Sequence, residues 1–404
     1  MIMIGGWADI YAKAKACGFD LTLVQMKSDI KPRDIDIVDQ IISSELSDKI
    51  VLDLVQTIHN KHPFEVAVSF SELGLMNAAL IKERLGIDGN PLTPVLLTRD
   101  KGKMRERMRE AGIASIPHAV VTSVEQVVAF GHQCGWPIIL KPANGVGSRQ
   151  IHKLFSQDDA AAAFTTIRQD DNTASVIKHD FPDQDILAEK FVAGPEVSVE
   201  AISWDGRHSV LCVTDKITTG YPRFVETGHS LPSALPPATT DAIEALVRAF
   251  LDAVGHRHGP SHTEVIVTEQ GPIIVESHTR TGGDRIFEMV ELAFGVDLFG
   301  ATLQGFAGCF PSVTPSKSGG AAIRYLTLPE GRVSAIDGVE QAAGLPGVVR
   351  CDVGIKVGDR AKAFIDSNVR YGYVLATGDS REQAIENVER AMAAITIVVD
   401  QDHV

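Results

Sequence analysis

The sequence has few of the features that mark secreted, membrane-spanning or nucleic-acid-binding proteins. Its five cysteines stand singly, with no CxxC pair and an odd total, which predicts reduced thiols in a cytoplasm rather than a disulfide framework or a zinc site. No apolar run approaches the roughly 20 residues that span a bilayer, and the N-terminal segment lacks the basic and long apolar regions of a signal peptide. The 52 acidic residues outnumber the 38 basic ones and give a net charge of −14. We therefore expect a cytoplasmic protein that binds neither nucleic acid nor a membrane.

Length and composition predict an ordinary globular protein with more than one domain. A chain of 404 residues fits two or three domains, and 44% hydrophobic with 22% charged residues is typical of folded proteins. Changes of pattern divide the chain into an N-terminal α/β part (1–95), a linker helix with a small lid-like segment (96–190), a central part (191–315) and a C-terminal α/β part (316–404). The second part opens with a charged pattern that predicts one helix over 96–114.

The N-terminal part alternates between strand and helix signals. Strand-like apolar runs at 1–4, 21–25 and 66–70 are separated by helical patterns, of which those at 7–17 and 76–85 are the clearest. Such alternation is typical of a parallel sheet whose strands are connected by helices.

The segment KPANGVGSRQI is the first that carries chemistry. An apolar strand at 138–140 leads into Lys141, and Gly145 and Gly147 then free the backbone to turn its amides toward one point, where Ser148 adds a hydroxyl. Converging amides beside a lysine suit phosphate oxygens. A glycine-rich hairpin with an exposed lysine explains the same residues, so both interpretations stay open at this point.

The segment HTEVIVTEQGPIIVESHTRTGG is the second. Glu264 and Glu276 lie on two strand-like runs, and a turn at 270–272 would set them side by side on one face of a hairpin. Adjacent carboxylates repel unless a cation neutralises them, and two carboxylates with nucleotide phosphates are a usual way to hold Mg²⁺. Two solvated acids at a sheet edge are the alternative. Arg280, shortly before Gly283, is suited to stabilise phosphate or an oxyanion, and equally to pair with Glu276.

The order of these pieces carries more information than any one of them. A lysine on a helix, a lysine before a glycine-rich loop, an EKFV segment, a GPE segment and two spaced glutamates followed by an arginine resemble the ATP-grasp superfamily over roughly residues 1–400. The resemblance implies an α/β protein with an α+β lid, in which an N-terminal parallel α/β domain precedes the ATP-grasp core and a small C-terminal domain follows it.

The resemblance also implies how ATP would be bound. Lys101 is similar to the first phosphate lysine of the family, with Lys103 as the competing choice, and Lys141 is similar to the second. The other positions that match nucleotide-binding residues are Gly145, Gly147 and Ser148 in the loop over the triphosphate, Glu189, Lys190, Phe191 and Val192 in the adenine hinge, and Glu196 as the ribose acceptor.

Glu264 and Glu276 resemble the magnesium ligands of the family, with Mn²⁺ as an acceptable substitute. Arg280 resembles the residue that stabilises the acyl phosphate and the tetrahedral intermediate. Many members have Asn two residues after the second metal glutamate, whereas this sequence has His278 there. Because Mg²⁺ prefers oxygen donors, His278 is not expected to replace that ligand.

Within the superfamily, ESHTR and PRFVETGHSLPSAL are most similar to the L-amino acid ligases, which include dipeptide ligases of antibiotic biosynthesis. That similarity implies that Glu226 receives a substrate ammonium, that His229 contacts the acceptor or a carboxylate, and that Arg280 and Gly283 border the substrate. The implied partners are a small carboxylic acid and an amine, and homodimers are common in the family. A ligase or carboxylase acting on bicarbonate or formate, and a nucleotide-binding regulator without turnover, are the competing functions.

Overall fold

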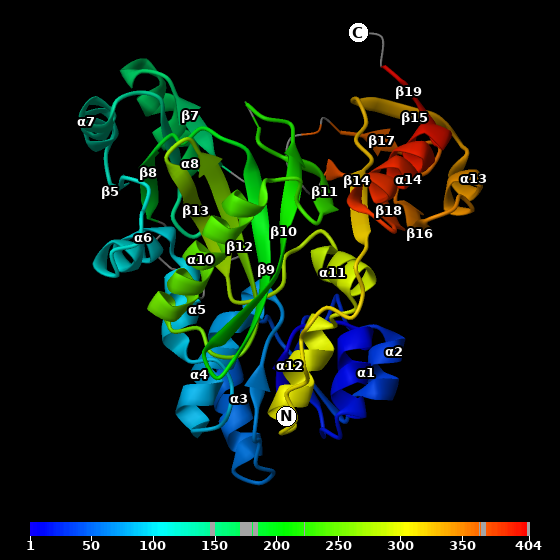
Figure 1. Cartoon of the computed structure of the whole chain (residues 1–404). Helices are drawn as coiled ribbons and strands as arrows, with labels where there is room; N and C mark the ends of the chain where they lie inside the picture. The colour runs from blue at the N-terminus through cyan, green and yellow to red at the C-terminus, as the bar shows by residue number, and fades with distance from the viewer. Residues whose placement is uncertain are drawn as a thin grey trace.

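The N-terminal part of the computed structural model is a four-stranded parallel sheet in the order β3-β2-β1-β4 (Figure 1). The parallel α/β arrangement predicted from the alternating pattern is confirmed. The strands are β1 (Ile2–Ile4), β2 (Thr22–Gln25), β3 (Gln40–Ser43) and β4 (Ala67–Val68), and the helices are α1 (Ala8–Ala16), α2 (Pro32–Ile37), α3 (Ile50–His59), a 3-10 turn (Glu72–Gly74) and α4 (Leu75–Leu85). The structure describes residues 1–145, 150–169, 180, 185–221, 223–362, 364 and 369–401.

Two helices, not one, connect this sheet to the rest of the chain. The prediction of a single helix over 96–114 is wrong, because α5 (Leu92–Arg99) ends before Asp100 and α6 (Lys101–Glu110) begins after it. Asp100 has an extended backbone, and its Oδ1 accepts a hydrogen bond from the Lys103 amide at 3.0 Å. A side-chain oxygen that satisfies a free amide of the first turn starts a new helix. Lys101 is therefore the first residue of α6.

A small antiparallel sheet forms the lid segment at the upper left of Figure 1. Its order is β5-β8-β6-β7, so β6, which carries Lys141, has a neighbour on each side. The strands are β5 (His118–Val121), β6 (Ile138–Pro142), β7 (His152–Leu154) and β8 (Ile186–Lys190), and the described helices are α7 (Val124–Cys134) and α8 (Ala160–Arg168). The predicted loop residues Gly147 and Ser148 lie outside the described residues.

The centre of the molecule is an eight-stranded sheet in the order β13-β12-β9-β10-β11-β14-β18-β16. Its last three strands come from the C-terminal part, so that part shares a sheet with the centre; the division into four domains remains a prediction. The strands are β9 (Glu196–Trp204), β10 (Arg207–Thr218), β11 (Glu226–Leu231), β12 (Gly259–Thr268), β13 (Gly271–His278), β14 (Gly320–Tyr325), β16 (Val348–Val353) and β18 (Gly372–Gly378). A three-stranded sheet is built by β15 (Gly331–Asp337), β17 (Arg360–Ala361) and β19 (Thr396–Asp400), and the helices are α10 (Pro237–Val254), α11 (Ile286–Phe294), α12 (Leu298–Phe306), α13 (Val339–Ala343) and α14 (Arg381–Ala394).

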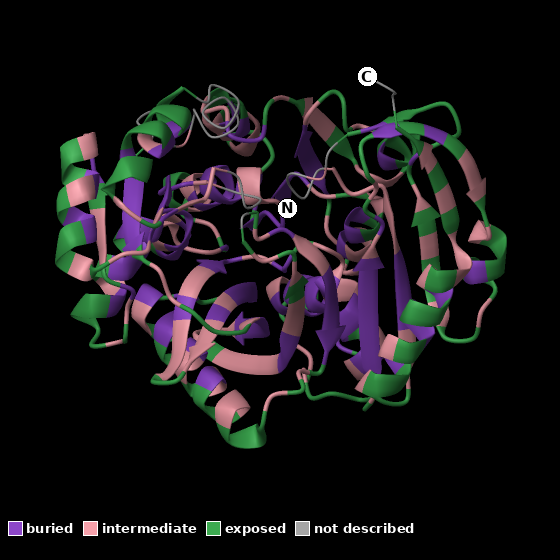
Figure 2. Cartoon of the chain, turned by 90° about the horizontal axis from the view of Figure 1, so that it is seen from above, coloured by how far each residue is buried: buried purple, intermediate pink, exposed green. Residues whose placement is uncertain are grey.

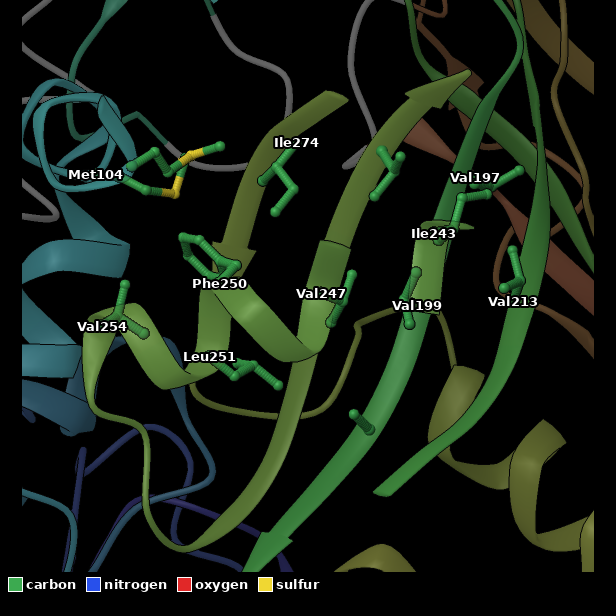
Figure 3. Packing of buried hydrophobic residues seen from close by; sticks show 13 residues of the cluster. Met104, Val197, Val199, Val213, Ile243, Val247, Phe250, Leu251, Val254 and Ile274 are labelled. Carbon is green, nitrogen blue, oxygen red and sulfur yellow. The ribbon is translucent and has the colours of Figure 1, made fainter. Parts of the chain in front are cut away.

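The hydrophobic core on one face of the large sheet explains why the opposite face is free for a site. Figure 3 shows Phe250 and Leu251 of α10 facing Val199 of β9 and Ile274 of β13, and Val265 of β12 belongs to the same buried cluster. Side chains alternate along a strand, so the neighbours of these core residues point to the other face. Buried residues follow the strands and exposed ones gather on the outer helices (Figure 2).

The described helices include none that is long and apolar enough to cross a membrane. All five cysteines are free thiols, as their spacing predicted.

Candidate active site

One cavity of about 390 Å³ lies between the lid segment, the large sheet and the loop after β13. Every site residue that was predicted from the sequence and that the structure describes lines it. These residues are Lys101, Lys141, Gly145, Glu189, Lys190, Phe191, Val192, Glu196, Glu226, His229, Glu264, Glu276, Arg280 and Gly283. These residues are spread along the sequence from Lys101 to Gly283, and folding brings them together around one cavity.

Glu264 and Glu276 face this cavity as a cross-strand pair, as the hairpin interpretation predicted. The turn differs from the prediction, because β12 ends at Thr268 and β13 begins at Gly271, which leaves a two-residue connection. An unbroken ladder from this turn would pair Glu264 with Val275. The register instead shifts by one residue between Val265 and Glu264, and this β-bulge brings Glu276 opposite Glu264.

Lys101 reaches the cavity from the first turn of α6 and contacts Glu276 of this acidic pair. Its side chain is 6% exposed, and its Nζ lies 2.9 Å from Glu276 Oε1 and 2.8 Å from the Gly145 carbonyl oxygen. Burial raises the pKa of Glu276, but Lys101 and His278 outweigh burial and lower the pKa to about 2. Lys103, the competing lysine, is 59% exposed and pairs with Asp100 outside the cavity.

Lys141 is buried on β6 next to a carboxylate that is shared with a second cation. Glu189 Oε2 lies 2.6 Å from Lys141 Nζ, and Glu189 Oε1 accepts from Arg105 Nε at 2.8 Å. Burial raises the pKa of Glu189, yet the two cations outweigh it and lower the pKa to about 2. Burial lowers the pKa of Lys141, an effect that Glu189 opposes. The Glu189 side chain, predicted to face adenine, thus holds the phosphate-lysine candidate in place.

Lys216, which the sequence reasoning missed, is the central cation of the cavity. Its Nζ contacts Glu196, lies 3.0 Å from Glu264 Oε1 and lies 3.3 Å from Glu226 Oε1. Burial lowers the pKa of Lys216, but the three glutamates outweigh burial and raise the pKa well above its usual value. The ammonium of Lys216 therefore contacts the carboxylates that were predicted to bind ribose (Glu196), the metal ion (Glu264) and the substrate (Glu226).

Arg280 is held by the N-terminal part of the chain and not by Glu276. Its Nε donates to Glu72 Oε2 at 2.6 Å, and its Nη1 donates to the Thr281 carbonyl oxygen at 2.7 Å. The option that Arg280 is a structural partner of Glu276 is not supported, because Glu276 contacts Lys101 and His278 instead. Glu72, 208 residues earlier, was not recognised in the sequence.

Glu226 and His229 both line the cavity although they stand three apart on β11. Residues three apart on a regular strand point to opposite faces, and a register shift where Thr218 pairs with Glu226 removes that conflict. His229 Nε2 lies 2.8 Å from Asp284 Oδ2. Asp284 in turn accepts from Arg370, and neither of these two residues was recognised in the sequence.

The donor set fits a hard divalent cation. Carboxylate oxygens are the ligands that Mg²⁺ prefers, and Glu264 and Glu276 supply two such groups. Each is paired with a lysine, Glu264 with Lys216 and Glu276 with Lys101. With the cation and nucleotide bound, these lysines would pair with phosphate oxygens instead. The described residues contain no group of three or more His, Cys, Asp or Glu side chains arranged for a metal ion. The pair would therefore bind the ion together with nucleotide oxygens. His278 Nε2 lies 3.1 Å from Glu276 Oε1, so it orients that carboxylate.

Three family models match successive parts of the chain. Residues 11–89 match the ATP-grasp N-terminal domain, residues 134–288 match the ATP-grasp domain, and residues 324–400 match the L-amino acid ligase C-terminal domain 2. The fold and the site define a member of the ATP-grasp superfamily, the class that the resemblance implied.

Curated relatives narrow this assignment. The chain is 27% identical over 300 residues to the uncharacterized protein y4rH of Sinorhizobium fredii, covering 73% of this chain and 60% of that protein. It is 25% identical over 332 residues to the L-arginine-specific L-amino acid ligase of Bacillus subtilis (80% and 76%), and 27% identical over 241 residues to the alanine–anticapsin ligase of Bacillus subtilis strain 168 (56% and 51%). The chain thus spans between half and about three quarters of the length of these relatives.

The solved structure of the L-amino acid ligase from Bacillus licheniformis has the same fold, with a TM-score of 0.82, 20% sequence identity and coverage of 99% of this chain and 98% of that one. The protein belongs to the L-amino acid ligase family of ATP-grasp enzymes. This is a family of ATP-dependent, ADP-forming acid–amino-acid ligases.

Proposed function

We propose that the protein is an ATP-dependent carboxylate–amine ligase that forms an amide or peptide bond, uses at least one L-amino acid, and releases ADP and phosphate. The observation that carries this proposal is the pairing of Glu264 with Glu276 across β12 and β13 inside a cavity that also holds Lys101 and Lys141. Two carboxylates and two buried lysines at one point suit a nucleotide triphosphate and its cation better than any other ligand class.

In the proposed reaction, a substrate carboxylate oxygen attacks the γ-phosphorus of ATP. The bond between that phosphorus and the bridging oxygen of the β-phosphate breaks, which gives an acyl phosphate and ADP. Lys101 and Lys141 line the cavity and would compensate the charge on the phosphate oxygens during transfer. Their counter-ions Glu276 and Glu189 keep both ammonium groups in place before nucleotide arrives.

An amine nitrogen then attacks the acyl carbon, the bond from this carbon to the phosphate oxygen breaks, and the amine proton passes to solvent. Arg280 is the cation that would stabilise the tetrahedral oxyanion, and its hydrogen bond to Glu72 fixes its position. Glu226 would accept the ammonium of the amino acid and His229 would contact the acceptor or a carboxylate, since both side chains belong to residues that line the cavity.

Glu264 and Glu276 would hold Mg²⁺ or Mn²⁺, which when bound supplies charge compensation for the phosphates. Lys216 Nζ lies 3.0 Å from Glu264 Oε1, so Lys216 would share this carboxylate with the ion. The adenine and ribose would lie near Phe191 and Val192, which follow β8 of the lid segment, and near Glu196 at the start of β9, all of which line the cavity.

The test is a phosphate-release screen with Mg-ATP over pairs of L-amino acids and short carboxylic acids, followed by mass measurement of the product. We expect release that needs both partners, and a product whose mass equals their sum less one water. Phosphate release that depends on bicarbonate or formate alone, or no release with any pair, would contradict the proposal.

A further inference from the structure

The loop that joins β13 to α11, residues 279–285, carries Arg280 and Gly283 to the cavity and is anchored by two distant parts of the chain. Near its start, Arg280 donates to Glu72 of the N-terminal part at 2.6 Å. Near its end, Asp284 accepts two hydrogen bonds from Arg370, which precedes β18 in the C-terminal part, at 2.7 and 2.5 Å. The loop is thus fixed from both sides.

The end held by Arg370 has a strained backbone. Asp284 and Arg285 have φ of +53° and +59°, a left-handed conformation that is uncommon for residues other than glycine. Such a conformation costs on the order of 1 kcal/mol per residue and persists only where surrounding contacts enforce it. Arg285 lies 5.0 Å from the ring centre of Tyr373 on β18 and donates to Glu288 at 2.7 Å. Two C-terminal residues, Arg370 and Tyr373, therefore contact the two strained positions.

The Asp284–Arg370 pair also determines where charge lies at this end of the cavity. The guanidinium of Arg370 meets both oxygens of Asp284 and stacks on Tyr325 at 3.8 Å from its ring centre, which fixes the plane of the fork. His229 Nε2 lies 2.8 Å from the same carboxylate. The charge of Asp284 is thus matched by Arg370, while the ring of His229 is oriented by Asp284.

We infer that Asp284 and Arg370 are a positioning pair, through which the C-terminal part sets the loop of Arg280 and Gly283 and the ring of His229 for the amino acid. The inference rests on the proposed function, because it concerns the same cavity. If the pair served stability alone, its loss would affect the use of amino acids and the binding of nucleotide equally. A positioning pair affects the amino acid and leaves the nucleotide unaffected, because the proposed contacts of adenine, ribose and phosphate lie on α6, β6, β8 with the two residues after it, and β9, and none lies on the loop 279–285.

The experiment compares Asp284→Asn, Arg370→Gln and the double variant with the wild-type chain. Arg360→Gln is the matched control, since Arg360 pairs with Glu330 at 3.5 Å and both are more than half exposed. Phosphate release is measured against the concentration of a mixture of the twenty proteinogenic L-amino acids, and the Kd of Mg-ADP is measured by calorimetry. A displacement of reacting groups by about 1 Å costs on the order of 100-fold, so we expect a loss of about that size in amino-acid kcat/KM with an unchanged Kd for Mg-ADP.

Two further results are expected of a pair that acts as a unit. The double variant should lose no more kcat/KM than the less active single variant, because the effects of substitutions at coupled residues are not additive. Arg370→Lys, which keeps the charge without the fork, restores part of the activity.

An unchanged amino-acid kcat/KM in Arg370→Gln, strictly additive losses, or a parallel loss of Mg-ADP affinity with a lower Tm would overturn the inference while the ligase proposal stands. If the wild-type chain releases no phosphate with any pair of L-amino acids or of an L-amino acid and a short carboxylic acid, the proposed function and this inference both fail.

Discussion

Glu276 lies directly opposite Glu264 only because Val275 is bulged out of the ladder between β12 and β13. The guanidinium of Arg105, a residue of α6 with no exposed surface, donates to the carbonyl oxygens of Ile274 and Val275 at 3.0 and 2.5 Å. A bulge leaves such carbonyls outside the ladder, and buried carbonyls need donors. Arg105 therefore supports the pairing of the two carboxylates as well as the position of Glu189.

Replacing Glu276 by Gln should abolish ligation and leave the fold intact. The amide keeps the shape but removes one of the two charges at the proposed cation site, so amino-acid-dependent phosphate release should fall by about 100-fold or more. Glu269→Gln is the control, because Glu269 is exposed in the turn of the same hairpin. If Glu276→Gln turned over at the rate of the control, Glu276 would not be a ligand of the proposed cation.

Lys101→Met and Lys103→Met separate the two lysines of α6. Lys101 is buried against Glu276 and Gly145, whereas Lys103 is mostly exposed. We expect Lys101→Met to weaken Mg-ATP binding and to slow phosphate release on the order of 100-fold, since a preorganised charge at the phosphate is lost. Lys103→Met should match the wild type in both calorimetry and turnover. Equal losses in the two variants would count against this assignment.

Arg105→Met should destabilise the protein far more than Arg109→Met. The first variant leaves the buried carbonyl oxygen of Ile274, the partly buried one of Val275 and one oxygen of Glu189 without their donor, at about 1–3 kcal/mol for each unsatisfied buried group. Arg109 lies on the same helix, is 69% exposed and pairs with Glu106, so its loss should stay within about 0.5 kcal/mol. Urea unfolding of both variants tests this, and similar midpoints would show that Arg105 is dispensable for the bulge.

Acid should remove a stabilising contribution of Glu189. Its pKa falls from 4.5 to about 2 on folding, because Arg105 and Lys141 outweigh the effect of burial. A depressed carboxyl pKa stabilises the fold above the unfolded value, and this stabilisation is lost as the pH falls from about 4.5 toward about 2. The shift corresponds to about 3 kcal/mol. The free energy of unfolding of Glu189→Gln should lack this part of the pH dependence, and parallel curves for the variant and the wild type would contradict it.

The strands of the N-terminal sheet and the hairpin of the two glutamates could be predicted, because each depends on a pattern within a short stretch of sequence. Apolar runs predicted the parallel N-terminal strands, and two strand-like runs joined by a short turn predicted the pairing of Glu264 with Glu276, although the β-bulge that produces this pairing was not predicted. The split between α5 and α6 was also within reach, because Asp100 is a good N-cap residue directly before Lys101.

The partners of the site residues could not be predicted, because they come from distant parts of the chain. Lys216 appears in the sequence only as one polar residue within a strand, and its three glutamates lie on β9, β11 and β12, which meet only in the folded sheet. Arg105 reaches Val275 across 170 positions, and Arg370 reaches Asp284 across 86. No periodicity in a short window carries that information.

The anchoring of Arg280 by Glu72 has a practical consequence for protein engineering. A chimera that exchanged the N-terminal part for that of a relative would also exchange the counter-ion of this arginine, 208 positions away. Where the donor has no carboxylate at the position of Glu72, the chimera should lose activity through the missing counter-ion rather than through poor folding, and a single glutamate restored at that position should recover it.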